Sequence, residues 1–322
     1  MVADTRAYKP RLLGLHHVTA TSDDAQADLD FCLDVLGLRL VKKTVNFDNH
    51  FVYHFYYGNT VGNPGTLWTT FPYKGHGVRI GVKGAGQVTV TAFSVPASSL
   101  DTWRRRLQAR GVRFEDAGSR FGDDAIVIVD PSGLVFELIG AHHDDRTPWT
   151  GSGVTADAAI RGLHSVTLTV ASPDVTAEYL ERHLGFSVEA AEGRRVRLAL
   201  NGGGPGRVLD LVHDPSAPAA VNGLGTVHHV ALAVATGDEQ RTLREALLEA
   251  GSLVTEIRDR QYFTSIYFRV PGGVLFEVAT TGPGFAVDEP ENSLGRELKL
   301  PPSAEQHRST IEAGLDVVHY RA

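Results

Sequence analysis

Two histidine pairs occupy matching positions in strand-like stretches near opposite ends of the sequence. His16 and His17 stand in GLHHVTAT, residues 14–21, and His228 and His229 stand in TVHHVALAV, residues 226–234. A carboxylate, Glu277, lies in the apolar stretch VLFEVAT, residues 274–280. Neutral imidazoles and a carboxylate from different strands of one sheet form a three-point face for a divalent metal, with the opposite positions open for substrate and O2. The residue types therefore predict a metal site.

Strand alternation distinguishes the two histidines of the later pair. His228 shares a face with the larger apolar residues at 230, 232 and 234, which suit packing beneath a helix. His229 shares a face with the alanines at 231 and 233, whose small side chains leave room for a ligand. We therefore expect His229 to face the metal.

The same strand alternation indicates which histidine of the first pair faces the metal. His17 shares a face with Thr19 and is the counterpart of His229. His164 in GLHSV is an alternative that would keep all ligands in the second half of the chain. Aligning GLHSV with GLHHV places His164 opposite His16 and Ser165 opposite His17, so parity favours His17 as the third ligand. Each of these histidines also has a simpler interpretation as a hydrogen-bonded core residue.

Four internal repeats supply the elements that position these residues. Each repeat begins with an alternating strand, continues with an amphipathic helix that ends at a glycine, and closes with further short strands. The helix-ending glycines are Gly37, Gly111, Gly185 and Gly251. The sequence thus predicts an α+β protein built from four βαβββ modules.

The repeats divide the chain into expected domains. We assign two modules to residues 1–145, a linker to 146–159, two modules to 160–284, and a tail with one short helix to 285–322. The matching turns PSGLVFEL and PGGVLFEV place Glu137 in the second module where Glu277 stands in the fourth. The second and third modules would form an inactive copy of the site from Ser165, the Gln87–Val88 region and Glu137, with Glu137 paired to a neighbour.

Composition limits the partners. The 322 residues carry a net charge of −7 and no basic run, which argues against nucleic acid and against an anionic membrane. No apolar run approaches the length of a membrane span, and the N-terminus lacks the apolar core of a signal peptide. The single cysteine, Cys32, excludes an internal disulfide. We expect a cytoplasmic protein that acts on small molecules, with a homo-oligomer as an open possibility.

The longer motifs carry a family resemblance over nearly the whole chain. GLHHVTA, LGLRLVKKTVNFD, GNPGTLWTTFP, DRQYFTSIYFR and PGGVLFEVAT resemble the vicinal oxygen chelate superfamily, and within it the hydroquinone ring-cleaving dioxygenases. The resemblance implies two half-barrel domains and Fe(II) held by His17, His229 and Glu277. It also implies supporting or catalytic roles for a further set of residues: His16, Thr19, His228, Arg260 and Tyr267.

The resemblance implies cleavage of a small hydroquinone by O2. In that reaction Tyr267 and Arg260 would bind the phenolate or developing oxygen charge, and His228 or His16 would move a proton. Catechol cleavage, a glyoxalase-type isomerase and an antibiotic-binding protein are the alternatives. Four aromatic residues are expected to line a pocket for an aromatic guest, or else to belong to the core: Phe51, Tyr53, Phe263 and Phe268.

Overall fold

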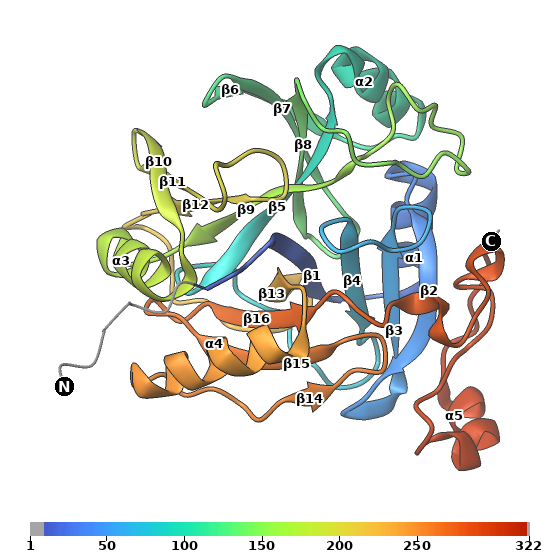
Figure 1. Ribbon diagram of the computed structural model, residues 1–322. Coiled ribbons are helices and arrows are strands. Elements are labelled where there is room, and N and C mark those ends of the chain that lie inside the picture. Colours follow the sequence, from blue (N-terminus) through green and yellow to red (C-terminus); the bar gives the residue numbers. More distant parts are fainter. Residues whose placement is uncertain (1–9, 321–322) are drawn as a thin grey trace.

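The structure is a computed structural model that describes residues 10–320. It contains four βαβββ modules in chain order (Figure 1). The first is β1 (Gly14–Ser22), α1 (Ala25–Asp30), β2 (Arg39–Asn46), β3 (Asn49–Gly58) and β4 (Leu67–Pro72). The second is β5 (Gln87–Pro96), α2 (Leu100–Ala109), β6 (Phe114–Arg120), β7 (Asp123–Val129) and β8 (Val135–Ala141).

The second half of the chain repeats this order. The third module is β9 (Gly162–Thr169), α3 (Pro173–Leu184), β10 (Ser187–Glu192), β11 (Arg195–Ala199) and β12 (Val208–Val212). The fourth is β13 (Thr226–Val234), α4 (Gly237–Glu249), β14 (Arg258–Asp259), β15 (Thr264–Arg269) and β16 (Leu275–Thr280). The tail adds short 3-10 turns and α5 (Arg308–Gly314). These elements confirm the predicted α+β fold of four modules.

The helix of each module is followed by the predicted left-handed glycine. The φ angles of Gly37, Gly111, Gly185 and Gly251 are 71°, 67°, 74° and 84°. Glycine adopts this conformation without the steric cost that a Cβ atom imposes, so it stops the helix and redirects the chain into a strand. In the first module the helix widens before that stop, with one π-helical turn at Phe31–Val35.

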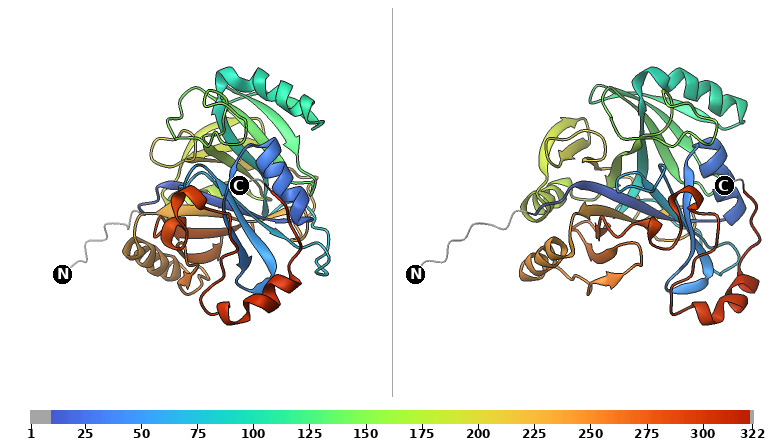
Figure 2. Two further views of the ribbon diagram at one scale, coloured as in Figure 1. Left: turned by 90° about the vertical axis from the view of Figure 1, so that its right-hand side faces the viewer. Right: turned by 45° about the vertical axis from the view of Figure 1, so that its right-hand side comes forward.

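The modules combine across the linker into two eight-stranded sheets. One sheet has the order β14-β15-β16-β13-β1-β4-β3-β2, and the other β10-β11-β12-β9-β5-β8-β7-β6. Each sheet therefore joins a module from the first half of the chain to one from the second, as the views in Figure 2 show. The expected division at the linker separates the sequence into halves, but the sheets do not follow it, because β1 pairs with β13 and β5 with β9.

Alternation within the central strands directs apolar residues to one face. Val230 and Leu232 of β13 and Phe276 and Val278 of β16 are fully buried members of one large core cluster. The odd-numbered positions between them face the other way and provide the concave side of the sheet. The hydrophobic core thus supports the strands on which His229 and Glu277 lie.

Candidate active site

Three potential ligands converge on the concave side of the first sheet. His17 lies on β1, His229 on β13 and Glu277 on β16. Their ligand atoms lie within 4.8 Å of one another, and all three residues are buried. The Nε2 atoms of His17 and His229 are 3.1 Å apart. They lie 3.3 and 2.8 Å from Glu277 Oε2, respectively. The fold therefore brings together the two histidines that strand alternation favoured and the carboxylate of the last strand.

Both histidine pairs lie at β-bulges. The register joins Leu15 to Leu232 and His17 to Ala231, so His16 is an extra residue in β1. It then joins Thr19 to His229 and Ala20 to Val227, so His228 is an extra residue in β13. A bulge re-aims the local side chains, which lets two neighbouring residues contact each other instead of pointing to opposite faces.

These contacts fix which nitrogen of His17 is available. His16 Nε2 lies 3.2 Å from the carbonyl oxygen of Thr280, which can only accept, so Nε2 donates and the neutral ring accepts at Nδ1. Burial lowers the pKa of His16 to about 3, so the ring is neutral. His17 Nδ1 lies 2.9 Å from His16 Nδ1 and is therefore the donor. His17 Nε2 keeps its lone pair and points toward His229 and Glu277, as a metal ligand requires.

His229 is held in a corresponding way. Its Nδ1 lies 2.8 Å from Nδ1 of His228, whose own side chain is exposed. The first histidine of each pair thus supports the second, and the Nε2 atoms of both supported rings face the same point.

Glu277 completes the ligand set. Its side chain is fully buried, Ser265 Oγ donates to Oε1, and Oε2 receives no hydrogen bond of good geometry within the described residues although both imidazoles are near. Burial opposes ionisation of Glu277, but the neighbouring imidazoles of His17 and His229 favour the carboxylate and hold the pKa of Glu277 well below its usual range. A buried carboxylate oxygen facing two imidazole nitrogens fits a divalent cation. The donor set therefore fits the metal that the sequence predicts.

Tyr267 and Arg260 lie beside this cluster. Tyr267 on β15 stands opposite Glu277 on β16, and its ring lies 5.7 Å from that of His229. Arg260 Nε donates to the Tyr267 hydroxyl at 3.1 Å. Burial raises the pKa of Tyr267, so the phenol stays protonated at neutral pH. A guanidinium and a neutral phenol are two donors for an oxygen that carries negative charge.

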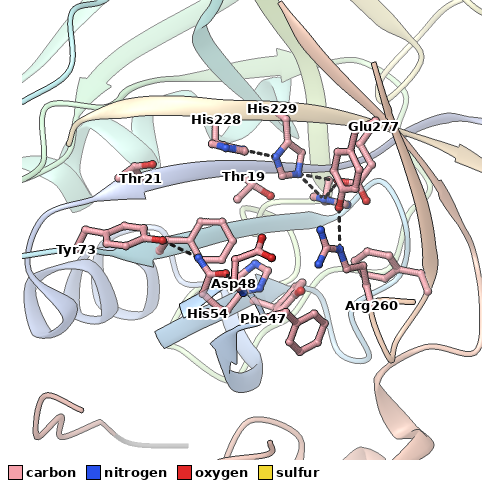
Figure 3. A pocket seen from close by; sticks show the side chains of 16 residues that line it. Thr19, Thr21, Phe47, Asp48, His54, Tyr73, His228, His229, Arg260 and Glu277 are labelled. Carbon is pink, nitrogen blue, oxygen red and sulfur yellow. Dashed lines mark hydrogen bonds and ion pairs between the residues drawn. The ribbon is translucent and has the colours of Figure 1, made fainter. Parts of the chain in front are cut away.

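The ligand set opens onto a small cavity of about 200 Å³. Phe263 lies against it, with its ring 5.3 Å from that of His17. Across from the ligand set, polar side chains from β2, β3 and their connecting turn face the cavity (Figure 3). They include Asn46, Asp48 and His54.

His54 belongs to a hydrogen-bonded chain that runs back to β1. His54 Nε2 lies 3.0 Å from Thr69 Oγ1, which lies 2.7 Å from Thr19 Oγ1. Burial and repulsion from His17 and His229 lower the pKa of His54 well below its usual value. Asn46 donates to the Tyr73 hydroxyl at 2.7 Å on the same side of the cavity. The cavity therefore has one end formed by the three potential metal ligands and an opposite polar wall.

The structure places most of the predicted residues at this cavity. Seven of the eight line it: His17, Thr19, His228, His229, Arg260, Tyr267 and Glu277. His16 is not among the lining residues and lies behind His17, against Thr280. Of the four aromatic residues expected at a pocket, Phe263 alone lines the cavity. Phe51 is 44% exposed, Tyr53 bonds to the tail and Phe268 is in the core, so the pocket interpretation was wrong for these three.

Ser265, Thr69 and the polar wall were not predicted from the sequence. Ser265 precedes Tyr267 by two positions on β15, so alternation could have placed it beside Glu277. The wall residues carry no comparable signal, because they reach the site only through the pairing of β2, β3 and β4 with β1.

At the corresponding place in the second sheet the carboxylate is kept as Glu137, but the two histidine positions are occupied by other residues. Ala92 pairs with both Ser165 and Glu137, as Ala231 pairs with both His17 and Glu277. The register places Val90, rather than the Gln87–Val88 region, at the position of His229. Arg120 lies 2.5 Å from Glu137, which confirms the predicted structural ion pair.

Comparisons with known proteins agree with this geometry. The chain belongs to the Glyoxalase/Bleomycin resistance protein/Dioxygenase superfamily, which it matches over residues 14–138 and 162–278. It is 42% identical to the "Putative ring-cleaving dioxygenase MhqO" of Bacillus subtilis over 95% of this chain and 96% of that protein. It is 37% identical to the chlorohydroquinone/hydroquinone 1,2-dioxygenase of Sphingobium indicum over 92% of this chain and 93% of that protein. The predicted superfamily is confirmed.

Solved structures confirm the predicted half-barrel fold. A "putative dioxygenase" from Bacillus subtilis superposes with a TM-score of 0.92 at 41% identity, covering 98% of this chain and 99% of that one. Glyoxalase I from Zea mays superposes with a TM-score of 0.62 at 16% identity, covering 83% of this chain and 92% of that one, and shares the fold. None of the helices described in residues 10–320 has the length and apolar character needed to cross a membrane.

Proposed function

We propose that the protein is an Fe(II)-dependent dioxygenase that opens hydroquinone rings with O2. The observation that carries this proposal is the convergence of two histidines and one carboxylate, His17, His229 and Glu277, on one cavity. Such a facial set with open positions is typical of non-heme iron oxygenases. The similarity to a hydroquinone 1,2-dioxygenase supports the choice of substrate.

The side chains around the ligand set have separable roles in this proposal. Bound iron would supply a path for electrons between the ring and O2. Arg260 and Tyr267 donate hydrogen bonds to the phenolate oxygen and to negative charge that develops during ring opening. Phe263 covers the imidazole of His17 and excludes water. His228 lines the cavity, whereas His16 lies behind His17, so His228 is better placed to move a proton.

The cavity matches a single aromatic ring. Its volume is about 200 Å³. A cavity of about 150 Å³ holds one benzene molecule in an engineered protein, so one substituted aromatic ring fits this cavity. A hydroquinone bound to the metal through one oxygen points its second hydroxyl away from the ligand set. The polar wall that contains His54 and Asn46 offers partners for that hydroxyl.

Three alternatives compete with this proposal. Catechol cleavage would place both substrate oxygens on the metal and leave the polar wall unused. A glyoxalase-type isomerase is expected to use a second carboxylate, but among the described residues the convergent set contains Glu277 alone. A binding protein for planar antibiotics needs no convergent metal ligands.

The proposed partners are a small aromatic substrate and O2, while a cytoplasmic location and a homo-oligomer stay predictions.

Oxygen uptake distinguishes these possibilities. The protein is loaded anaerobically with Fe(II) and given methylhydroquinone and catechol in parallel reactions. We expect rapid uptake with methylhydroquinone and loss of that uptake in His229→Ala. Faster uptake with catechol would identify a catechol dioxygenase, and no uptake with either substrate despite bound iron would contradict the proposal.

A further inference from the structure

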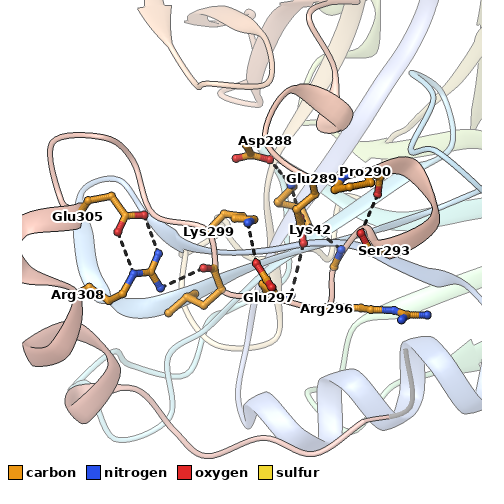
Figure 4. A network of polar contacts seen from close by, with 12 residues as sticks. Lys42, Asp288, Glu289, Pro290, Ser293, Arg296, Glu297, Lys299, Glu305 and Arg308 are labelled. Carbon is orange, nitrogen blue, oxygen red and sulfur yellow. Dashed lines mark hydrogen bonds and ion pairs between the residues drawn. The ribbon is translucent and has the colours of Figure 1, made fainter.

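A buried ion-pair cluster connects the C-terminal tail to β2, outside the cavity (Figure 4). Lys42 on β2 is fully buried, and its ammonium contacts the carboxylates of Asp288 and Glu289. A buried ammonium is costly unless it is paired and hydrogen-bonded. The two tail carboxylates therefore fix this part of the tail to the sheet.

One ammonium does not neutralise two carboxylates, so the cluster needs further donors. Lys42 contacts Asp288 Oδ1, and the other oxygen of that carboxylate faces a different segment. Gln261 Nε2 donates to Asp288 Oδ2 at 2.8 Å, and the Tyr262 hydroxyl donates to the same atom at 3.0 Å. Lys42 also lies over the Tyr262 ring, 4.9 Å from its centroid. Asp288 thus joins β2 to the turn at residues 260–263.

This turn is conformationally strained. Gln261 has a φ angle of 66°, in the left-handed region that is sterically unfavourable for a residue with a Cβ atom. The turn is closed by backbone hydrogen bonds from Tyr262 N to Arg260 O at 2.7 Å and from Arg260 N to Phe263 O at 2.9 Å. Such a conformation persists when surrounding contacts determine it, and strained residues often lie beside functional sites.

The two ends of the turn are residues of the cavity. Arg260 donates to the Tyr267 hydroxyl, and the Phe263 ring lies 5.0 and 5.3 Å from the rings of His16 and His17. A shift of the turn moves both side chains together, because their backbones are hydrogen-bonded to each other.

We infer that Asp288 is a positioning residue: this tail carboxylate, anchored by Lys42 of β2, fixes the 260–263 turn and so places Arg260 and Phe263 at the cavity. Its effect on turnover rests on the proposed function, whereas its effect on the turn does not. Glu289 shares the contact with Lys42 but has no contact with the turn among the described residues, which makes it the matched control.

The first test is amide hydrogen exchange on metal-free protein. Asp288→Ala and Glu289→Ala each remove one carboxylate from Lys42, but only the first removes the acceptor of Gln261 and Tyr262. We expect Asp288→Ala to speed exchange in residues 259–264 by about tenfold or more while leaving β1 and β13 protected. Glu289→Ala should leave exchange of the turn as in the parent protein. Equal exchange of the turn in both variants would overturn the inference.

The second test is a double-mutant cycle on the Fe(II)-loaded protein. We expect Asp288→Ala to lower kcat/KM for methylhydroquinone about 10- to 100-fold, because small displacements of positioning groups have effects of this size. In an Arg260→Ala/Phe263→Ala background the same change should cost less than about twofold, because the groups it positions are already absent. A full additional loss in that background would contradict the positioning role.

A third variant covers the case in which Asp288→Ala loosens the whole sheet. Tyr262→Phe keeps the ring over Lys42 and removes only the hydroxyl that donates to Asp288. We expect faster exchange confined to residues 259–264, and unchanged exchange there would overturn the inference. Because exchange needs neither iron nor substrate, a protein without dioxygenase activity would contradict the proposed function and leave this test intact.

Discussion

The two related carboxylates, Glu277 on β16 and Glu137 on β8, permit a test with an internal control. They occupy equivalent positions of the two sheets and are both buried, but Glu277 faces two imidazoles and Glu137 faces Arg120. We predict that Glu277→Gln abolishes stabilisation of the protein by Fe(II), whereas Glu137→Gln leaves it intact.

The magnitude follows from the charge that the substitution removes. Glu277 is the one anionic member of the convergent set. Two unit charges 4 Å apart interact by about 4 kcal/mol at an effective dielectric constant of 20, and a divalent ion doubles this value. Even a fraction of that energy, about 2.7 kcal/mol, weakens metal binding about 100-fold. An iron concentration 100 times the parent Kd stabilises the parent by about 2.7 kcal/mol but such a variant by about 0.4 kcal/mol.

The assay is anaerobic thermal unfolding with and without ferrous iron. At roughly 2 °C per kcal/mol for a chain of this size, the iron-dependent rise in Tm should be roughly 5 °C for the parent and below about 1 °C for Glu277→Gln. Glu137→Gln should start from a lower Tm, because Arg120 loses its charged partner, and should still show the full rise. A parent-sized rise in Glu277→Gln would refute the assignment of this carboxylate as a ligand.

Three further predictions concern separate parts of the molecule. Tyr267→Phe should lower kcat by about 10- to 100-fold with unchanged iron content, because it removes a donor and no ligand, and unchanged steady-state kinetics would exclude Tyr267 from the reaction. His54→Leu should raise KM for methylhydroquinone by about tenfold without affecting iron content, since it removes a polar partner for the second hydroxyl; an unaltered KM would place that hydroxyl elsewhere. Burial raises the pKa of Asp130 to about 7, so its contribution to stability is complete below about pH 4 and is lost as the pH rises through about 7. Asp130→Asn should therefore flatten the decline of the unfolding free energy over this range in denaturant titrations, and a parallel decline would contradict the raised pKa.

The convergence of His17, His229 and Glu277 could be predicted because it depends on local rules. Alternation along β13 and β16 separates His229 and Glu277 from the core residues between them, and the repeat transfers the same frame to His17. The four modules could also be predicted from the sequence, because the glycines that end the helices recur at matching positions.

Features that depend on strand register were harder to predict from the sequence. The register assigns Val90, rather than the Gln87–Val88 region, to the position of His229, and Thr89 is an extra residue in β5 just as His228 is in β13. The pairing of the first module with the fourth, and the polar wall from β2 and β3, result from contacts between distant segments. Local sequence patterns carry no direct information about them.

The most direct test of the central claim is the fate of isotopically labelled O2. Fe(II)-loaded protein and methylhydroquinone are reacted under labelled O2, and the product is analysed by mass spectrometry. The account predicts a ring-opened acid that carries labelled oxygen in its new carboxylate, formed by the parent and by Glu137→Gln but not by Glu277→Gln. An unlabelled quinone formed together with labelled hydrogen peroxide would contradict it, because the site would then oxidise the ring without cleaving it.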